Sequence, residues 1–439
     1  MFHHPDKRII KNEQVLDFTI ERLGECQVAS PMRGVRFTCD DEKLLYHACL
    51  DDIRRCPQGG AEPPALEFAG PRERIFFKPQ EIACGIVTCG GLCPGLNNVI
   101  RAITLSLHHH YGVNKVYGFR YGYEGLVKRL GHQPLELTRP MVNRIGELGG
   151  TILGSSRGPQ DPAEMVDFLE ELEISILFAI GGDGTLKGAG KIAKEAARRG
   201  RPIGVIGIPK TIDNDICFIQ KTFGFETAVT EAQRSTYAAH TEAIGARNGI
   251  GLVKLMGRDS GFIAAYAALS DSQVNFCLVP EVPFSVAGLL EALSERLERR
   301  GHAVIVVAEG AGQELLSAKA EHDASGNFKL ADIGTFLRDA IKEHFHRKKM
   351  EISLKYIDPS YTIRSQPANP HDSAFCLLLG HNAVHAGMAG RTGMVVGFWN
   401  HQFTHVPISL AVSKRKKIDP EGWQWNSVMA STGQPRELR

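Results

Sequence analysis

Short apolar runs that end near glycine and are followed by helix-like segments recur along the chain from about residue 81. These runs are rich in β-branched residues and lie at 82–88, 175–180, 202–208, 251–256, 276–279 and 303–308. Strands that are buried on both faces of a sheet read as continuous apolar runs, because helices cover both faces. The pattern predicts an α/β protein with two similar doubly wound lobes and mostly parallel sheets.

Two of the intervening segments carry clear helix signals. Residues 186–199 are rich in Ala and Lys, and residues 287–300 are followed by Gly301, the residue type that most often ends a helix. In open α/β sheets, ligands bind beyond the carboxyl ends of the strands. We therefore expect the functional residues to lie just after each apolar run.

Composition and periodicity divide the chain into four parts. Residues 1–78 contain several prolines and no sustained periodicity, so we predict an N-terminal extension there. We predict a first lobe over 79–215, rejoined by part of the C-terminal region, and a second lobe over 216–400. Residues 401–439 are predicted to form a C-terminal segment that packs back on the lobes.

The charge balance excludes some classes of protein. The chain has 51 Lys and Arg residues against 49 Asp and Glu residues, and basic clusters such as Arg198-Arg199 are expected to be solvated faces. Ten cysteines show no paired framework, and several lie in apolar runs, which is typical of a reducing compartment. No apolar run approaches a membrane span, and there is no hydrophobic signal region. We expect a cytoplasmic protein that binds neither nucleic acid nor membranes.

Two glycine-rich turns follow the first two runs, at 88–97 (TCGGLCPGLN) and 181–185 (GGDGT). Glycines let the backbone approach a phosphate chain, and a helix that begins there offers free amides. The first turn could equally be a tight strand-to-helix connection, and Cys89 and Cys93 lack the second pair that a metal site needs. Asp183 could bind Mg²⁺ or cap the following helix. The second turn also occurs in NAD kinases and diacylglycerol-type lipid kinases, so it indicates a kinase without saying which.

A third motif, 209–215 (PKTIDND), directly follows the apolar run that ends at 208. Its hydroxyl and two carboxylates form a cluster suited to abstracting a proton and ordering a metal ion, with Asp213 as the candidate base and Asp215 beside it. The alternative is a loop that satisfies its own turn hydrogen bonds. Because the motif follows a second phosphate-type turn, we favour the functional interpretation.

With these motifs in this order, the chain resembles the phosphofructokinase family. The resemblance continues through 256–262 (MGRDSGF), 280–284 (PEVPF), 308–312 (AEGAG) and 358–364 (DPSYTIR). It covers roughly residues 80 to 400 and is strongest to the long ATP-dependent enzymes of plants and trypanosomes, which are related to the pyrophosphate-dependent branch. The resemblance implies the phosphofructokinase fold, with the donor mainly on the first lobe, the sugar phosphate mainly on the second, and a homodimer or homotetramer.

The resemblance also implies an activity, the phosphorylation of fructose 6-phosphate at its 1-hydroxyl by ATP and Mg²⁺ in glycolysis, with allosteric control. The nucleotide would contact Gly91, Tyr123, Arg157, Gly182, Asp183, Gly184 and Thr185, with Asp183 as the Mg²⁺ ligand. Phosphoryl transfer would depend on Asp213 as base, aided by Lys210, Thr211 and Arg258. The sugar phosphate would contact Thr211, Asp213, Asp215, Met256, Gly257, Arg258, Glu281, Tyr361 and Arg364, together with Lys355 from a neighbouring subunit.

Two residues bear on the identity of the donor. Pyrophosphate-dependent members usually have Asp where this chain has Gly184, and a carboxylate there would repel the α-phosphate of a nucleotide. Lys210, however, matches that branch, since bacterial-type enzymes usually have Gly at its position. We predict ATP as donor. A pyrophosphate-dependent enzyme and a non-catalytic regulatory paralogue that binds sugar phosphate are the alternatives.

Overall fold

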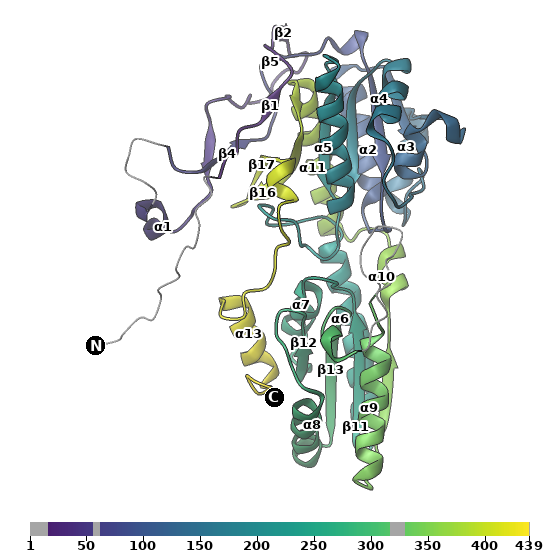
Figure 1. Ribbon diagram of the computed structural model, residues 1–439, viewed down its shortest axis with the longest axis vertical. Helices are drawn as coiled ribbons and strands as arrows, with labels where there is room; N and C mark the ends of the chain where they lie inside the picture. The colour runs from purple at the N-terminus through teal and green to yellow at the C-terminus, as the bar shows by residue number, and fades with distance from the viewer. Residues whose placement is uncertain (1–15, 56–61, 317–329, 439) are drawn as a thin grey trace.

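The computed structural model describes residues 16–55, 62–316 and 330–438, which form two α/β lobes stacked end to end (Figure 1). The sheet of the first lobe has nine strands in the order β3 (Lys43–Leu45), β4 (Ala65–Phe68), β17 (Gln402–Pro407), β16 (Met394–Trp399), β10 (Gly204–Pro209), β9 (Ile174–Gly181), β6 (Ala83–Thr88), β7 (Lys115–Phe119) and β8 (Leu135–Glu136). The sheet of the second lobe has the order β12 (Phe276–Leu278), β13 (His302–Ala308), β11 (Gly249–Leu255) and β14 (Ser353–Ile357). All six predicted runs form strands.

The first-lobe sheet is parallel from β16 to β7 and antiparallel toward both edges. Helices α2 (Leu96–Ser106) and α11 (Pro370–Met388) cover one face, and α4 (Pro162–Glu171) and α5 (Asp183–Arg198) cover the other. Successive strand residues point to opposite faces, so neighbours in β6 enter different cores: Ile86 packs on the α2 side and Val87 on the α5 side. This two-sided burial explains the unbroken apolar runs.

The second lobe repeats the arrangement around a wholly parallel sheet. Helices α6 (Phe225–Ile244) and α7 (Phe262–Ser270) cover one face, and α8 (Val286–Arg300) and α9 (Ile333–Arg347) cover the other. The side chain of Ser285 accepts a hydrogen bond from Gly288 N at the start of α8, and Gly301 (φ 73°) ends it as predicted. The predicted fold class is confirmed.

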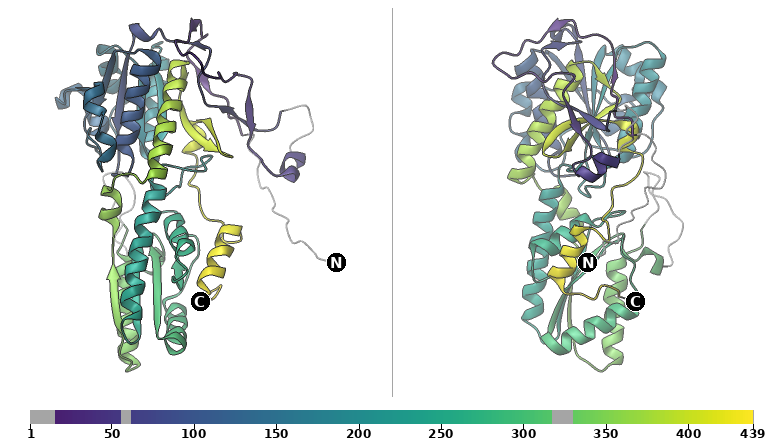
Figure 2. Two further views of the ribbon diagram at one scale, coloured as in Figure 1. Left: turned by 180° about the vertical axis from the view of Figure 1, so that it is seen from behind. Right: turned by 90° about the vertical axis from the view of Figure 1, so that its left-hand side faces the viewer.

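The structure differs from the predicted division near residue 400, because the chain returns to the first lobe earlier. After α10 (Ser360–Ser365), helix α11 packs on α2, and β16 and β17 join the first-lobe sheet. A boundary at 400 cuts the hairpin in which Trp399 pairs with Gln402. The chain then passes along both lobes, and α13 (Trp423–Thr432) packs on α7 (Figure 2).

The region predicted as an N-terminal extension forms the edge of the first-lobe sheet through β3 and β4. An ion-pair network, buried except at Asp40, holds it there. Arg391 is fully buried, and its guanidinium lies 2.6 Å from Asp40 Oδ1 and 2.9 Å from Glu67 Oε1. Arg72 bonds the same two carboxylates, at 2.7 and 3.1 Å. Buried charges need such partners, so the network makes this edge an integral part of the lobe.

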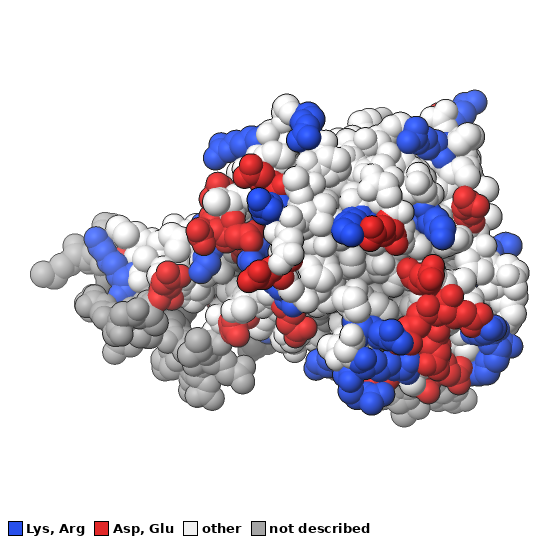
Figure 3. Space-filling model, turned by 90° about the horizontal axis from the view of Figure 1, so that it is seen from above, with Lys and Arg blue, Asp and Glu red and all other residues white. Residues whose placement is uncertain are grey.

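On the face seen from above, acidic and basic side chains lie beside one another (Figure 3). At the C-terminal end of α5, Arg198 contacts Glu195 at 2.7 Å, and Arg199 contacts the same carboxylate at 2.7 Å. This basic cluster is thus paired with acidic neighbours. Across 16–55, 62–316 and 330–438, no helix is long and apolar enough to cross a bilayer.

Candidate active site

A cleft of about 580 Å³ lies between the two lobes, beyond the carboxyl ends of β6, β9 and β10. Parallel strands present these ends at one edge of a sheet, so the three motifs that follow them converge. The residues that line the cleft include Gly91, Tyr123, Arg157, Gly182, Asp183, Gly184, Thr185, Lys210, Thr211, Asp213, Asp215, Met256, Arg258 and Arg364. Most of the predicted site residues therefore share one cavity.

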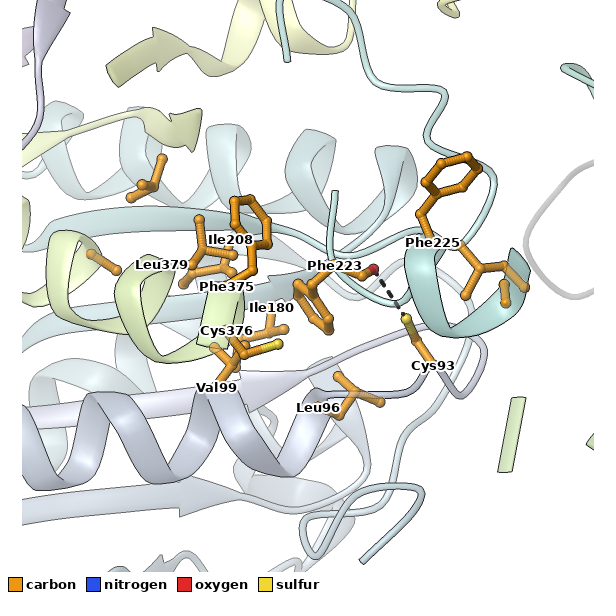
Figure 4. Close-up of a cluster of buried hydrophobic side chains, with 14 of the residues drawn as sticks. Cys93, Leu96, Val99, Ile180, Ile208, Phe223, Phe225, Phe375, Cys376 and Leu379 are labelled. Atoms are coloured by element: carbon orange, nitrogen blue, oxygen red, sulfur yellow. Dashed lines mark hydrogen bonds between the residues drawn. The ribbon is translucent and has the colours of Figure 1, made fainter. Parts of the chain in front are cut away.

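The turn after β6 is fixed from behind by a cluster of buried side chains (Figure 4). Cys93 Sγ donates a hydrogen bond to the carbonyl oxygen of Phe223 at 3.4 Å. Gly95 has a φ of 99°, and a Cβ there would lie 2.7 Å from Cys376 Sγ, so only glycine fits. The cluster thus sets the path by which the turn enters α2.

The thiols of this turn are poor metal ligands. Burial raises the pKa of Cys89 to about 12 and also raises the pKa of Cys93. Metals bind the thiolate rather than the thiol. Within the part of the chain that the structure describes, no group of three or more His, Cys, Asp or Glu side chains is arranged to hold a metal ion.

The turn after β9 leads directly into α5, with Gly182 as the N-cap residue. Asp183 is the first residue of the helix, so it does not act as the cap. Its carboxylate instead lies in the cleft, 2.8 Å from Lys187 Nζ and 3.7 Å from Arg415 Nη2. A Cβ placed on Gly184 meets no heavy atom within 4 Å, so this residue faces open space.

Tyr123 supports this second turn from below. Its buried hydroxyl donates a hydrogen bond to the carbonyl oxygen of Thr185 at 2.5 Å. Its ring packs on α5 at Gly188, where a Cβ would lie 2.5 Å from the ring. The residue lines the cleft, but its polar atom is engaged within the protein.

The third motif satisfies most of its polar groups internally. Thr211 Oγ1 donates to Asp215 Oδ1 at 3.0 Å and accepts from Asp213 N at 3.1 Å. Asn214, in the left-handed region (φ 52°), accepts from Thr222 N at 3.0 Å. These are the turn hydrogen bonds of the alternative interpretation. They leave out the Asp213 side chain, whose buried Oδ1 has no hydrogen-bond partner among the described residues.

Lys210 joins the third motif to the first. Its buried ammonium donates from Nζ to the carbonyl oxygen of Gly91 at 2.7 Å. Gly90 (φ 86°) brings the turn close, because a Cβ there would lie 3.3 Å from the same Nζ. Burial lowers the pKa of Lys210. The phosphate-type turn and the acidic loop therefore form one connected floor of the cleft.

The electrostatics of the cleft single out Asp213. Burial, followed by the nearby carboxylates of Asp215 and Glu309, raises its pKa to about 8, although Arg364 and Arg415 oppose this change. A small change in pH near neutrality therefore shifts such a carboxyl group between its protonated and its ionised form. That property, in a cleft, is typical of a general base.

The second lobe supplies the other wall. Met256 and Arg258 follow β11, and Arg364 lies on α10. Gly257 between them has a φ of 126°, and a Cβ there would lie 2.7 Å from the carbonyl oxygen of Ser260. The turn therefore requires glycine, and it aims the side chains around it at the cleft.

Four predicted sugar-phosphate residues, the turn residue Gly257 among them, are not among those that line the cleft. The carboxylate of Glu281 accepts hydrogen bonds from Gly261 N at 3.1 Å and Ile418 N at 2.9 Å. Lys355 is exposed on β14, and Tyr361, on α10, is 84% exposed. Their predicted roles stay predictions.

Several residues that line the cleft had no predicted role. Lys187 was detectable, since it lies one helical turn after Asp183. Glu309 belongs to a motif that supported the resemblance but carried no role. Arg415 stands in the basic run 414–417, where composition indicates only a charged surface. Its position in the cleft depends on the path of the C-terminal segment.

Comparison with protein families matches residues 83–387 to the family described as Phosphofructokinase. The match spans more than half of the chain. The chain belongs to the phosphofructokinase family. The resemblance stated from the three motifs is thereby confirmed.

Curated members of the phosphofructokinase family cover nearly the whole chain. An ATP-dependent 6-phosphofructokinase of Borreliella burgdorferi is 48% identical over 98% of this chain and 99% of its own length. The enzyme of the same name from Trypanosoma cruzi is 50% identical over 95% of this chain and 87% of its own length. A chloroplastic one from Arabidopsis thaliana is 47% identical over 84% of this chain and 69% of its own length.

Solved phosphofructokinase structures share the fold. A pyrophosphate-dependent phosphofructokinase of Marinobacter aquaeolei superposes with a TM-score of 0.67 at 19% identity, over 82% of this chain and 96% of its own. The Pichia pastoris phosphofructokinase gives a TM-score of 0.62 at 21% identity, over 85% of this chain and 38% of its own. At these identities the structural similarity shows the fold only, and it does not identify the phosphoryl donor.

Proposed function

We propose that this protein transfers the terminal phosphoryl group of ATP to the 1-hydroxyl of fructose 6-phosphate, forming fructose 1,6-bisphosphate as in glycolysis. The observation that carries the proposal is the Asp213 carboxylate, which lies in the same cleft as both glycine turns and keeps one oxygen without a partner among the described residues. Relatives named ATP-dependent 6-phosphofructokinase, 45–50% identical over nearly the whole chain, support it.

Asp213 would accept the proton of the sugar hydroxyl, while the surrounding residues orient the reactants. Phosphoryl transfer needs in-line positioning and charge stabilisation more than covalent help from the protein. Lys210 holds positive charge under the first turn through its bond to Gly91. Arg258 lines the opposite wall, where a guanidinium matches the geometry of phosphate oxygens. The cleft thus places a base and cations on the two sides of the reacting group.

The cleft also suits Mg²⁺. Asp183 presents a carboxylate next to the open space at Gly184. Mg²⁺ in kinases is typically held by one or two carboxylates together with phosphate oxygens and water, so a complete protein cage is not required. Asp183 would hold the ion, which would neutralise phosphate charge when bound.

The donor is proposed to be ATP because of Gly184. The absence of any heavy atom within 4 Å of its Cβ position leaves room for a nucleotide beside the first turn of α5. The amides at this helix start and its dipole favour an anionic ligand. A pyrophosphate donor would not need that room.

The sugar phosphate is proposed to bind against the second lobe, at Met256, Arg258 and Arg364. Tyr361 and Lys355 are exposed outside this cavity. Both are therefore available to a neighbouring copy, as expected for a homodimer or homotetramer in which two subunits complete each sugar site.

Activity assays with purified protein test the proposal. Fructose 6-phosphate and Mg²⁺ are supplied with either ATP or pyrophosphate, and fructose 1,6-bisphosphate is measured. We expect product with ATP and far less with pyrophosphate, whereas the reverse result would replace the donor. Binding of fructose 6-phosphate without turnover from either donor would indicate a regulatory paralogue. Asp213→Asn, prepared in parallel, controls for contaminating kinase.

A further inference from the structure

Arg415, on the C-terminal segment, reaches both acidic elements of the cleft. Its Nη1 lies 2.8 Å from Asp215 Oδ2, and its Nη2 lies 3.7 Å from Asp183 Oδ2. Its backbone pairs antiparallel with Ile216, beside the third motif. The side chain is 30% exposed and lines the cavity. One cation thus spans the glycine turn after β9 and the acidic loop after β10.

The segment that carries Arg415 is held by both lobes. Lys416 N donates to the carbonyl oxygen of Asp215 at 2.8 Å, in the first lobe. Ser260 Oγ donates to the carbonyl oxygen of Lys416 at 2.5 Å, and Ile418 N donates to Glu281 Oε1 at 2.9 Å, both in the second lobe. Arg415 is therefore held in the cleft by hydrogen bonds that join its segment to both lobes.

We propose that Arg415 is a donor-binding residue, which anchors one edge of its guanidinium on Asp215 and presents the other to the terminal phosphates of ATP. The guanidinium has five N–H donors in a rigid fork that matches phosphate oxygens. The bond to Asp215 fixes its orientation and uses only part of that capacity. This inference rests on the proposed function, because it assigns a further residue to the same donor site.

The charge distribution supports the assignment. Five carboxylates line the cleft, those of Asp183, Asp213, Asp215, Asp259 and Glu309. A polyphosphate entering among them would be repelled unless cations lie between. Arg415 stands between two of these carboxylates, Asp183 and Asp215. It brings positive charge to the place where the donor must approach Asp183.

Calorimetric binding tests the inference, with the Mg²⁺ complex of a non-hydrolysable ATP analogue as one probe and fructose 6-phosphate alone as the other. We expect Arg415→Met to weaken the analogue about ten-fold or more, because charge-assisted hydrogen bonds to phosphate are lost. Arg415→Lys restores part of the affinity. Lys417→Met, which removes an exposed charge from the same segment, binds like wild type. Fructose 6-phosphate binds all four proteins alike.

The outcomes separate the inference from the proposed function. Failure of the wild-type protein to bind the analogue would contradict the proposed function itself. If wild type binds and Arg415→Met binds equally well, Arg415 is not a donor-binding residue. Equal weakening of the analogue and of fructose 6-phosphate, with a lowered melting temperature, would also overturn the inference, since Arg415 would then be only a structural link between the lobes.

Discussion

Asp213 and Asp215 lie two residues apart in one loop, yet only Asp215 has both carboxylate oxygens engaged. Asp215 Oδ1 accepts from Thr211 Oγ1 at 3.0 Å, and Oδ2 accepts from Arg415 Nη1 at 2.8 Å. Asp213 Oδ1 is buried and has no partner among the residues that the structure describes. The loop therefore holds one carboxylate in place and leaves the other able to accept a proton.

Asp213→Asn keeps the shape of the side chain and removes its basicity. We expect kcat to fall by roughly 10²–10⁴-fold, while the dissociation constant of fructose 6-phosphate changes little. Because the folded pKa is raised to about 8, the charged carboxylate destabilises the fold as pH rises through that value. At pH 9 the variant should therefore melt no lower than wild type. Kinetics, calorimetry and thermal melts check this, and near-normal turnover would refute the role.

The same pKa predicts how activity depends on pH. With both substrates far below saturation, kcat/KM should rise with pH and level off above about pH 8, because the base must be ionised. Asp215→Asn removes a negative charge that raises this pKa, so its profile should level off at lower pH. Profiles from pH 6 to 9.5 for both proteins test the argument. It fails if the two profiles coincide.

Gly184→Asp tests the donor assignment. Gly184 lies in the first turn of α5, where an acidic residue suits the helix dipole, and its Cβ position meets no neighbour. The variant should fold with an unchanged melting temperature. Its carboxylate should raise the KM for ATP by about ten-fold or more, through repulsion of the nucleotide phosphates. Gly184→Ala, which adds bulk without charge, should have a much smaller effect. Equal effects of the two substitutions would point to steric exclusion instead.

Much of the fold was predictable because strands that are buried on both faces of a sheet are continuous apolar runs in the sequence. The strands β6, β9 and β10 were predictable from such runs. Because the carboxyl ends of parallel strands lie at one edge of a sheet, it was also predictable that the three turns after them converge on one cleft. The short edge strands β3 and β4 were not predictable. They depend on pairing with β17 and on the Glu67–Arg391 contact, which joins residues far apart in the chain.

Site residues show the same division between local and long-range causes. Asp183 and Asp213 stand in short motifs that directly follow the strands β9 and β10, so the sequence could place them. Arg415 reaches Asp215 across the chain, and Ile418 N brings the C-terminal segment onto Glu281. No local pattern encodes such contacts. They arise only when the chain, after the β16–β17 hairpin, crosses both lobes.

Lys254→Met tests how α10 is held for sugar-phosphate binding. Lys254 Nζ lies 2.8 Å from Asp358 Oδ2 and 3.1 Å from Asp332 Oδ1, and Asp358 in turn accepts from Ser360 N at 3.2 Å at the start of α10. Removing the cation deprives both carboxylates of their ion-pair partner, which should loosen the start of the helix that carries Arg364. We expect fructose 6-phosphate to bind roughly ten-fold more weakly, with the ATP analogue unaffected.

The exposed Lys342 on α9 provides the control for that experiment. Lys342→Met should bind both ligands like wild type. Equal weakening of the two ligands by Lys254→Met would show a general loss of structure rather than a local effect on α10.

His381 on α11 should make the protein less stable in mild acid. Burial, and then the neighbouring ring of His110 at 5.1 Å, lowers the pKa of His381 to about 4. The unfolded chain therefore binds a proton that the folded protein does not, so the free energy of unfolding should fall as pH drops from about 6.5 toward 4. His381→Gln should flatten this dependence by up to about one proton, measured by urea unfolding at several pH values.

The exposed His109→Gln is the control and should keep the wild-type slope. An unchanged slope in His381→Gln would mean that acid sensitivity arises elsewhere, for which the buried His385, with its pKa lowered to about 3, is the next candidate.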